Sequence, residues 1–169
     1  MSGEWRVASG EWRVWGTALN KNLREKIELM TDETDYDLLV RAAANARARS
    51  YSPYSKFRVG AALLTNDGKV YTGCNIENAA YSPTICAERV ALGAAIAAGE
   101  EIGSFEAIAV VADEAKPTSP CGVCRQVLSE LAPGVMVIMA AAPEKSGDRL
   151  EMKIEELLPH GFVFPKGQD

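Results

Sequence analysis

The sequence predicts an α/β fold in three layers, α/β/α, built on a mixed, mostly five-stranded sheet. Three observations lead to this prediction. Two strand-like segments joined by a tight turn come early, strands and helices then alternate, and the later strands are short apolar runs typical of strands buried on both faces. The length of 169 residues accommodates one ordinary domain.

The first half of the domain predicts a helix followed by a hairpin. Asp35–Arg49 has acidic residues early, basic residues late and many good helix formers between them, and a Pro-containing stretch then ends the helix. Phe57–Thr65 and Lys69–Cys74 read as strands. The turn Asn66–Gly68 between them suits a tight connection, so the two strands should be antiparallel.

The second half predicts helices and strands in alternation. Cys86–Ala98 reads as a helix that ends at Gly99, where glycine favours a left-handed cap. Pro120 precedes a second helix that begins with a cysteine. The remaining predicted elements are the strand Phe105–Ala112, the helix Cys121–Leu131, the strand Val135–Ala140 and a short strand over Arg149–Met152.

The N-terminal segment reads as an appendage to this domain. Residues 1–33 lack a sustained period of apolar residues, and Ser2–Val7 is repeated as Ser9–Val14. We therefore expect a flexible N-terminal extension over residues 1–33 and a single catalytic domain over residues 34–169.

Composition and charge exclude several functional classes. Lys and Arg total 18 against 23 Asp and Glu, a net charge of -5, so the chain offers no excess of positive charge to bind a phosphate backbone. The apolar runs are far shorter than the roughly 20 residues that cross a bilayer, and the N-terminus lacks the apolar core of a secretory signal. We expect no nucleic-acid partner, no membrane span and a cytoplasmic location.

Four cysteines suggest a metal site. Cys121 and Cys124 are three residues apart at the start of a helix, so one zinc ion can reach both sulfurs. Cys86 begins the other helix and is the best third ligand, because parallel strands would bring the two helix starts to one edge of the sheet. Disulfides remain the alternative. Spacing does not place Cys74, and a fourth thiolate would close the site against water.

Glu88 lies two residues after Cys86 and is the candidate proton carrier. A zinc-bound water has its pKa lowered to about 7, but deamination also needs a group that moves protons. The alternative is an ordinary acid in the first turn of a helix, which the helix dipole favours. Three thiolates and Zn²⁺ sum to a negative charge, and the neighbouring Arg89 could offset it.

Four motifs in order resemble the cytidine deaminase family, specifically its short, homotetrameric branch, over about residues 35–164. They are Tyr54–Leu63, Gly73–Ala79, Cys86–Arg89 and Pro120–Gln126. The resemblance implies a cytidine-deaminase-like fold, one zinc ion per subunit, and the Pro-Cys-x-x-Cys pair with a non-ligand Glu that characterises zinc deaminases. The chain departs from commoner relatives at Arg58, where a Pro often follows Phe57.

The resemblance also assigns roles to individual residues. By this likeness the metal ligands are Cys86, Cys121 and Cys124, with Cys74 a bystander, and Glu88 is the catalytic proton shuttle. Arg89 would donate hydrogen bonds to ligand sulfurs. The implied substrate contacts are Phe57 on the pyrimidine, Asn75 and Glu77 on the ribose and the main chain of Ala87 on the ring; the implied contacts to a neighbouring subunit's site are Phe162 and Tyr81.

The resulting hypothesis is a hydrolase of pyrimidine salvage. Zinc-activated hydroxide would attack C4 of cytidine or 2′-deoxycytidine, and uridine or 2′-deoxyuridine and ammonia would be the products. Two alternatives stay open: a deaminase of a related aminonucleoside such as blasticidin S, and a non-catalytic interaction module stabilised by zinc. The segments around Phe57 and Asn75 favour cytidine.

Overall fold

The fold is described by a computed structural model for residues 36–164. Its strands are β1 (Val59–Thr65), β2 (Val70–Cys74), β3 (Phe105–Ala112), β4 (Met136–Ala140) and β5 (Arg149–Lys153). Its helices are α2 (Asp37–Arg47), α3 (Ala87–Ala97), α4 (Gly122–Leu131) and α5 (Ile154–Leu157). The predicted extension over residues 1–33 lies outside the described residues. No helix within residues 36–164 combines the length and apolar character that crossing a membrane requires.

The five strands form one mixed sheet in the order β2-β1-β3-β4-β5. β1 runs antiparallel to both β2 and β3, β4 runs parallel to β3, and β5 returns antiparallel to β4. Asn66–Gly68 makes the turn of the first hairpin, and Gly68 takes a positive φ of 82° that glycine adopts readily. The predicted mixed, five-stranded sheet with flanking helices is confirmed.

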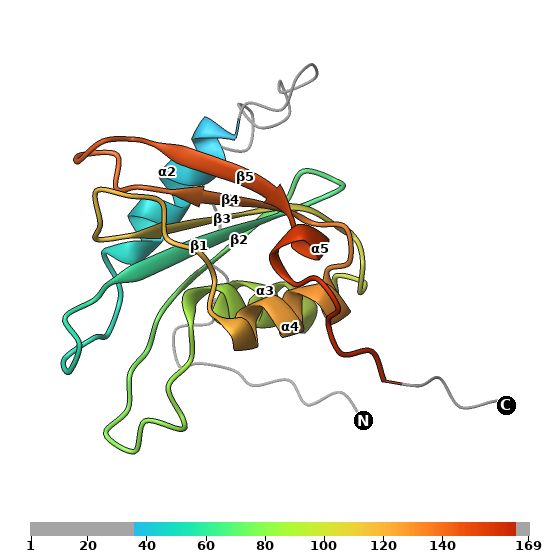
Figure 1. The fold of residues 1–169 in the computed structure, drawn as a ribbon, viewed down its shortest axis with the longest axis horizontal. Helices are drawn as coiled ribbons and strands as arrows, with labels where there is room; N and C mark the ends of the chain where they lie inside the picture. Colours follow the sequence, from blue (N-terminus) through green and yellow to red (C-terminus); the bar gives the residue numbers. More distant parts are fainter. Residues whose placement is uncertain (1–35, 165–169) are drawn as a thin grey trace, which may run out of the picture.

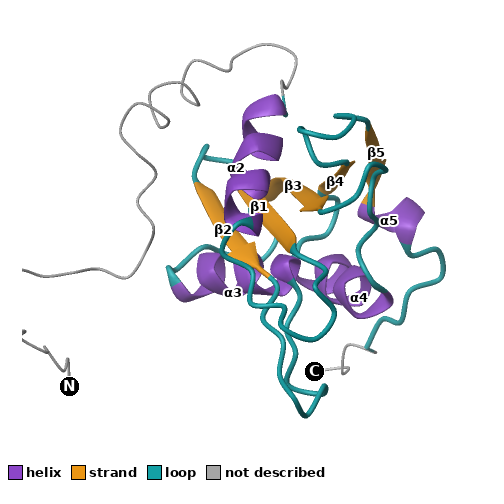
Figure 2. Cartoon of the chain, turned by 90° about the vertical axis from the view of Figure 1, so that its left-hand side faces the viewer, coloured by secondary structure: helices purple, strands orange, loops and turns teal. Residues whose placement is uncertain are grey.

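Helices cover both faces of the sheet and make three layers (Figures 1 and 2). α2 packs on one face, where Leu39 and Ala43 join Ala62 and Val111 of the sheet in one apolar core. The other face carries α3, α4 and α5. A second core there combines residues of those helices and of the sheet, among them Leu92, Leu128, Ile108, Val137 and Ile154.

Two glycines in the hairpin allow helices to lie close against the sheet. A Cβ atom at Gly60 would stand 2.0 Å from the carbonyl oxygen of Ala43 in α2. A Cβ atom at Gly73 would stand 2.4 Å from the carbonyl oxygen of Ala87 and 2.5 Å from the amide nitrogen of Ala91. Because these contacts involve main-chain atoms, any side chain would push the helix away. Gly73 therefore fixes the start of α3 against β2.

α3 and α4 begin at the same end of the sheet. β2 precedes α3 and β3 precedes α4, and these strands run in one direction because both are antiparallel to β1. The strands that carry the two helix starts are thus separated by β1 instead of being neighbours. The parallel pair that does occur, β3 with β4, is connected by α4.

Apart from shifts of one or two residues at the ends of other elements, the structure differs from the sequence prediction at two places. β1 begins at Val59 instead of Phe57, because the Phe57 carbonyl accepts a hydrogen bond from the Asn75 side chain instead of from a neighbouring strand. α5 was not predicted. This helix has four residues, too few to show a helical period, and the Glu156 carboxylate caps it by accepting a hydrogen bond from the Lys153 amide at 2.7 Å.

Candidate metal centre and active site

The start of each of two helices presents a cysteine. Cys86 is the N-cap residue of α3 and Cys121 that of α4, and both have extended backbone angles. Cys124 lies in the first turn of α4 and is buried. The first N–H groups of a helix have no intrahelical partner and carry partial positive charge, so both positions favour anionic sulfur.

The three sulfur atoms form one cluster. Their Sγ atoms all lie within 4.8 Å of one another, and those of Cys86 and Cys121 are 3.8 Å apart. Four zinc ligands at about 2.3 Å in a tetrahedron stand about 3.8 Å from each other, so the spacing fits a zinc ion. No other His, Cys, Asp or Glu joins this cluster within residues 36–164, and Cys74 is outside it. The donor set therefore leaves one coordination position for a small molecule.

The thiols of the cluster act on each other electrostatically. The neighbouring Cys124 thiol is the largest cause that lowers the pKa of Cys86, and the Arg89 guanidinium adds to it. The presence of Cys86 in turn is the largest cause that raises the pKa of Cys124. The opposite directions describe one thiolate beside one thiol, with Cys86 the first to lose its proton. A cluster that loses protons readily suits a cationic metal.

Glu88 lies beside the sulfurs in the first turn of α3. Glu88 is 4% exposed, and its side chain contacts Cys124. Burial raises the pKa of the Glu88 carboxyl, and the negative charge of Cys86 raises it further. A carboxyl group in this environment can hold a proton that an ordinary glutamate would release. This is the property that a proton carrier next to a metal site needs.

Arg89, in the first turn of α3, places a cation beside the sulfur of Cys86. Its Nη2 donates to the carbonyl oxygen of Thr84 at 3.1 Å and to Cys86 Sγ at 3.9 Å. Its Nε is buried without a hydrogen-bond partner among the described residues. The guanidinium therefore lies where it can reduce the negative charge of a thiolate cluster.

Asn75 follows β2 and holds the segment that precedes β1. Its Nδ2 donates to the Phe57 carbonyl oxygen at 2.9 Å, and its Oδ1 accepts from the Val59 amide at 2.8 Å and from Ser50 Oγ. Both acceptor positions of Oδ1 are thus occupied. One N–H of Nδ2 is left with no partner among these contacts, so Asn75 can approach a ligand as a donor.

Glu77 holds the loop before Phe57. Its carboxylate accepts hydrogen bonds from the main-chain amides of Tyr54 at 2.9 Å and Ser55 at 3.2 Å, and from Ser55 Oγ. The Ser55 hydroxyl is the largest cause that lowers the pKa of the Glu77 carboxyl. Since a carboxylate has about four acceptor positions, one remains for a ligand hydroxyl.

The other predicted contact residues fall into two groups. Phe57 is half-buried, and Ala87 is fully buried as the first residue of α3. Tyr81 and Phe162 are 77% and 67% exposed. Tyr81 lies next to Tyr54 with ring centroids 6.5 Å apart, and the Phe162 carbonyl accepts from Gln126 Nε2 at 2.9 Å. Both aromatic side chains therefore remain largely accessible on this chain.

Sequence reasoning gave no role to two residues that shape the site. Ser50 donates to Asn75 Oδ1 and so fixes the orientation of that amide. Arg125 donates from Nε to the Pro120 carbonyl oxygen and from Nη1 to the Leu157 carbonyl oxygen, both at 2.9 Å, and thereby ties the loop before Cys121 to α5. Ser50 and Arg125 bind main-chain atoms or residues distant in sequence, so no spacing pattern in the sequence indicates their roles.

A thiol-ligated zinc position beside a buried glutamate on an α/β sheet defines the class of zinc-dependent deaminases. The family model for the cytidine and deoxycytidylate deaminase zinc-binding region matches residues 33–140. The chain belongs to the cytidine deaminase family.

Individual relatives agree with this assignment. Cytidine deaminase of Sporosarcina psychrophila is 49% identical over 128 residues, which cover 76% of this chain and 91% of the relative. Cytidine deaminase of Halalkalibacterium halodurans is 48% identical over 129 residues, 76% of this chain and 95% of the relative. The crystal structure of cytidine deaminase from Burkholderia pseudomallei has a TM-score of 0.72 and 48% identity, and covers 77% of this chain and all (100%) of that one.

Proposed function

We propose that the protein catalyses the hydrolytic deamination of cytidine and 2′-deoxycytidine to uridine and 2′-deoxyuridine, with release of ammonia, in pyrimidine salvage. One observation carries this proposal. Three sulfur donors lie together, those of Cys86, Cys121 and Cys124, and no fourth donor joins them among the described residues. The buried Glu88 lies beside them. A structural zinc site would fill all four positions with protein ligands.

Glu88 supplies the proton transfers of the reaction. A zinc ion held by the three sulfurs would act as a Lewis acid and make water nucleophilic at neutral pH. The Glu88 carboxylate takes a proton from the attacking water and delivers it to N3 of the ring. It then takes the second proton of the added water from the hydroxyl at C4 and delivers it to the amino group at C4, which leaves as ammonia. Its raised pKa suits a group that alternates between base and acid.

The substrate contacts follow from the hydrogen-bonding capacity that remains. Asn75 has one N–H to donate, and Glu77 has one acceptor position, so together they match a sugar hydroxyl that accepts from one and donates to the other. Phe57 offers an aromatic face to the flat pyrimidine. The main-chain groups of Ala87 orient the ring at the start of α3.

An assay of the purified protein tests the function. With cytidine, we expect ammonia and uridine in equal amounts, and we expect a chelator to abolish the reaction and added zinc to restore it. Blasticidin S is the competing substrate. Turnover of blasticidin S in place of cytidine would favour the related aminonucleoside deaminase, and zinc binding without ammonia release from either compound would leave a non-catalytic zinc module.

We propose in addition that the protein is a cytoplasmic homotetramer with one zinc ion per subunit. The exposed rings of Phe162 and Tyr81 support an assembly in which they reach a neighbouring subunit's site. The free state of Cys74, Cys86, Cys121 and Cys124 suits a reducing compartment. Light scattering coupled to size-exclusion chromatography measures the subunit number, and a monomer would contradict the assembly.

A further inference from the structure

The segment Phe57–Val59 is attached to the rest of the protein on two sides. On one side Asn75 binds it through Phe57 and Val59, and the Asn75 amide donates to the Val59 carbonyl oxygen at 3.1 Å. On the other side the Asp113 amide donates to the Arg58 carbonyl oxygen at 3.1 Å, and Arg58 Nε lies 2.6 Å from Asp113 Oδ2. Phe57 is thus set between a residue of the proposed sugar site and a residue at the end of β3.

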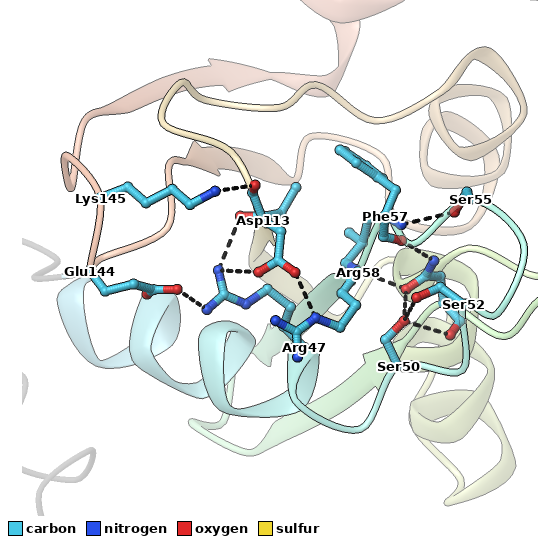
Figure 3. Close-up of polar contacts among 12 residues, drawn as sticks. Arg47, Ser50, Ser52, Ser55, Phe57, Arg58, Asp113, Glu144 and Lys145 are labelled. Atoms are coloured by element: carbon cyan, nitrogen blue, oxygen red, sulfur yellow. Dashed lines mark hydrogen bonds and ion pairs between the residues drawn. The ribbon is translucent and has the colours of Figure 1, made fainter.

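Asp113 is itself held in place by a buried cation (Figure 3). Arg47 at the end of α2 is 8% exposed, and its Nη1 lies 3.2 Å from Asp113 Oδ1 and donates to the Ala112 carbonyl oxygen at 3.1 Å. Its Nη2 binds Glu144, and Lys145 Nζ donates to the Asp113 carbonyl oxygen. Asp113 is therefore a fixed point to which Arg58 can anchor.

The two arginines that share the Asp113 carboxylate differ in what their loss would do. Arg47 is buried, so its removal would take away the buried partner of Asp113 Oδ1 and the donor to the Ala112 carbonyl oxygen, and would damage the fold. The Arg58 side chain is 49% exposed, and Asp113 keeps Arg47 without it. Arg58 can therefore be changed without leaving a buried charge unpaired.

We propose that Arg58 is a positioning residue that, through its ion pair with Asp113, holds the Phe57 ring where the pyrimidine binds. The inference rests on the proposed function, in which Phe57 packs on the substrate. Arg58 neighbours Phe57 directly, and its ion pair adds a side-chain attachment to the main-chain hydrogen bond between Asp113 and Arg58. Its effect should appear in substrate affinity, because Phe57 contacts the ring in the ground state and the transition state alike.

The test compares R58A and R58Q with the wild-type holoenzyme. We expect KM for cytidine and Kd for the product uridine to rise by about threefold to fivefold, the effect of losing one partly exposed ion pair, with kcat within about twofold. Zinc content should not change. At 1 M salt the wild-type KM should rise toward that of R58A, whose KM should not respond. The matched control is R149A. Arg149 is an exposed arginine on the edge strand β5 that lies 2.7 Å from Asp37, and its removal should leave KM unchanged.

A double-mutant cycle separates positioning from a general structural role. If Arg58 acts through Phe57, adding R58A to F57L should raise KM no further than F57L does by itself. An equal, additive rise in both backgrounds would overturn the inference, as would a KM within the error of wild type in both R58A and R58Q. If the wild type deaminates cytidine but the KM values contradict the role of Arg58, the proposed function still stands. A wild type without deaminase activity would overturn both the proposed function and the role of Arg58.

Discussion

The Sγ atoms of Cys86 and Cys121 lie 3.8 Å apart although the two residues are separated by 35 positions in sequence. Each residue caps a different helix, and the directions of β2 and β3 bring the two helix starts to one end of the sheet. This distance is the spacing of two zinc ligands in a tetrahedron. The fold itself therefore assembles the donor set.

Replacing any one of the three clustered cysteines by alanine should abolish zinc binding at equimolar metal. Two remaining sulfurs give too few ligands for a stable site, and deamination should be lost with the metal. Metal analysis of the purified variants measures the zinc content. Cys74→Ala is the control. Because Cys74 is outside the cluster, this variant should retain one zinc per chain. Loss of zinc from this control would assign Cys74 to the site.

Glu88→Gln should retain zinc and lower kcat by at least about a hundredfold, since general acid and base catalysis supplies that much or more. The amide keeps the shape of the buried side chain but cannot carry the protons. Rates and zinc content are measured on the same sample. Activity above about a tenth of wild type would remove Glu88 from the proposed role.

Arg89→Gln should bind zinc but turn over about tenfold to a hundredfold more slowly. The guanidinium lies 3.9 Å from Cys86 Sγ, and without it the negative charge of three thiolates weakens the metal as a Lewis acid. Arg89→Lys is the comparison. If charge is the cause, this variant should recover part of kcat, and equal rates in wild type and both variants would contradict the role.

Glu77→Gln should raise KM for cytidine by about tenfold at neutral pH, since hydrogen bonds to a charged acceptor are strong. The variant also weakens the hold of this carboxylate on the Tyr54 and Ser55 amides. Steady-state kinetics give KM and kcat separately. Glu130→Gln, an exposed acid on α4, is the surface control and should match wild type.

The lowered pKa of Glu77 sets the pH dependence of its contribution to stability. A carboxyl whose pKa is lower in the folded protein stabilises it above the ordinary value of 4.5, and this contribution is lost as the pH falls through the folded pKa. Urea unfolding of wild type and Glu77→Gln should therefore differ at pH 6 and converge as the pH falls below 4.5 and through the lowered pKa of the folded protein. A constant difference across this range would contradict the assignment.

The sequence was sufficient to predict the layers and the residues that form the metal cluster, because Cys-x-x-Cys and a helix that begins with a cysteine are local patterns. It did not predict how Arg47 joins Ala112 and Asp113, which lie 65 and 66 positions further along the sequence and meet it through the sheet. The start of the first strand, at Val59 instead of Phe57, also escaped prediction. Phe57 has the side chain of a strand residue, but the Asn75 amide takes its carbonyl.

Gly73→Ala should destabilise the protein and lower its zinc affinity, whereas Gly93→Ala should stabilise it. At Gly73 the new methyl group would stand 2.4 Å from the Ala87 carbonyl oxygen, so α3 must move away from β2. We expect a loss of about 1 to 3 kcal/mol in the free energy of unfolding, and the shift also moves Cys86, which caps this helix.

Gly93 lies in the same helix on an exposed face, and a Cβ there meets nothing within 4 Å. Alanine favours a helix interior over glycine by about 0.5 to 1 kcal/mol, so this variant should gain stability and keep its zinc affinity. Urea unfolding and competition with a chromogenic chelator measure the two quantities. The same substitution should thus act in opposite directions at Gly73 and Gly93. Equal effects on stability and zinc affinity at both positions would show that the distance between α3 and β2 does not control the position of Cys86.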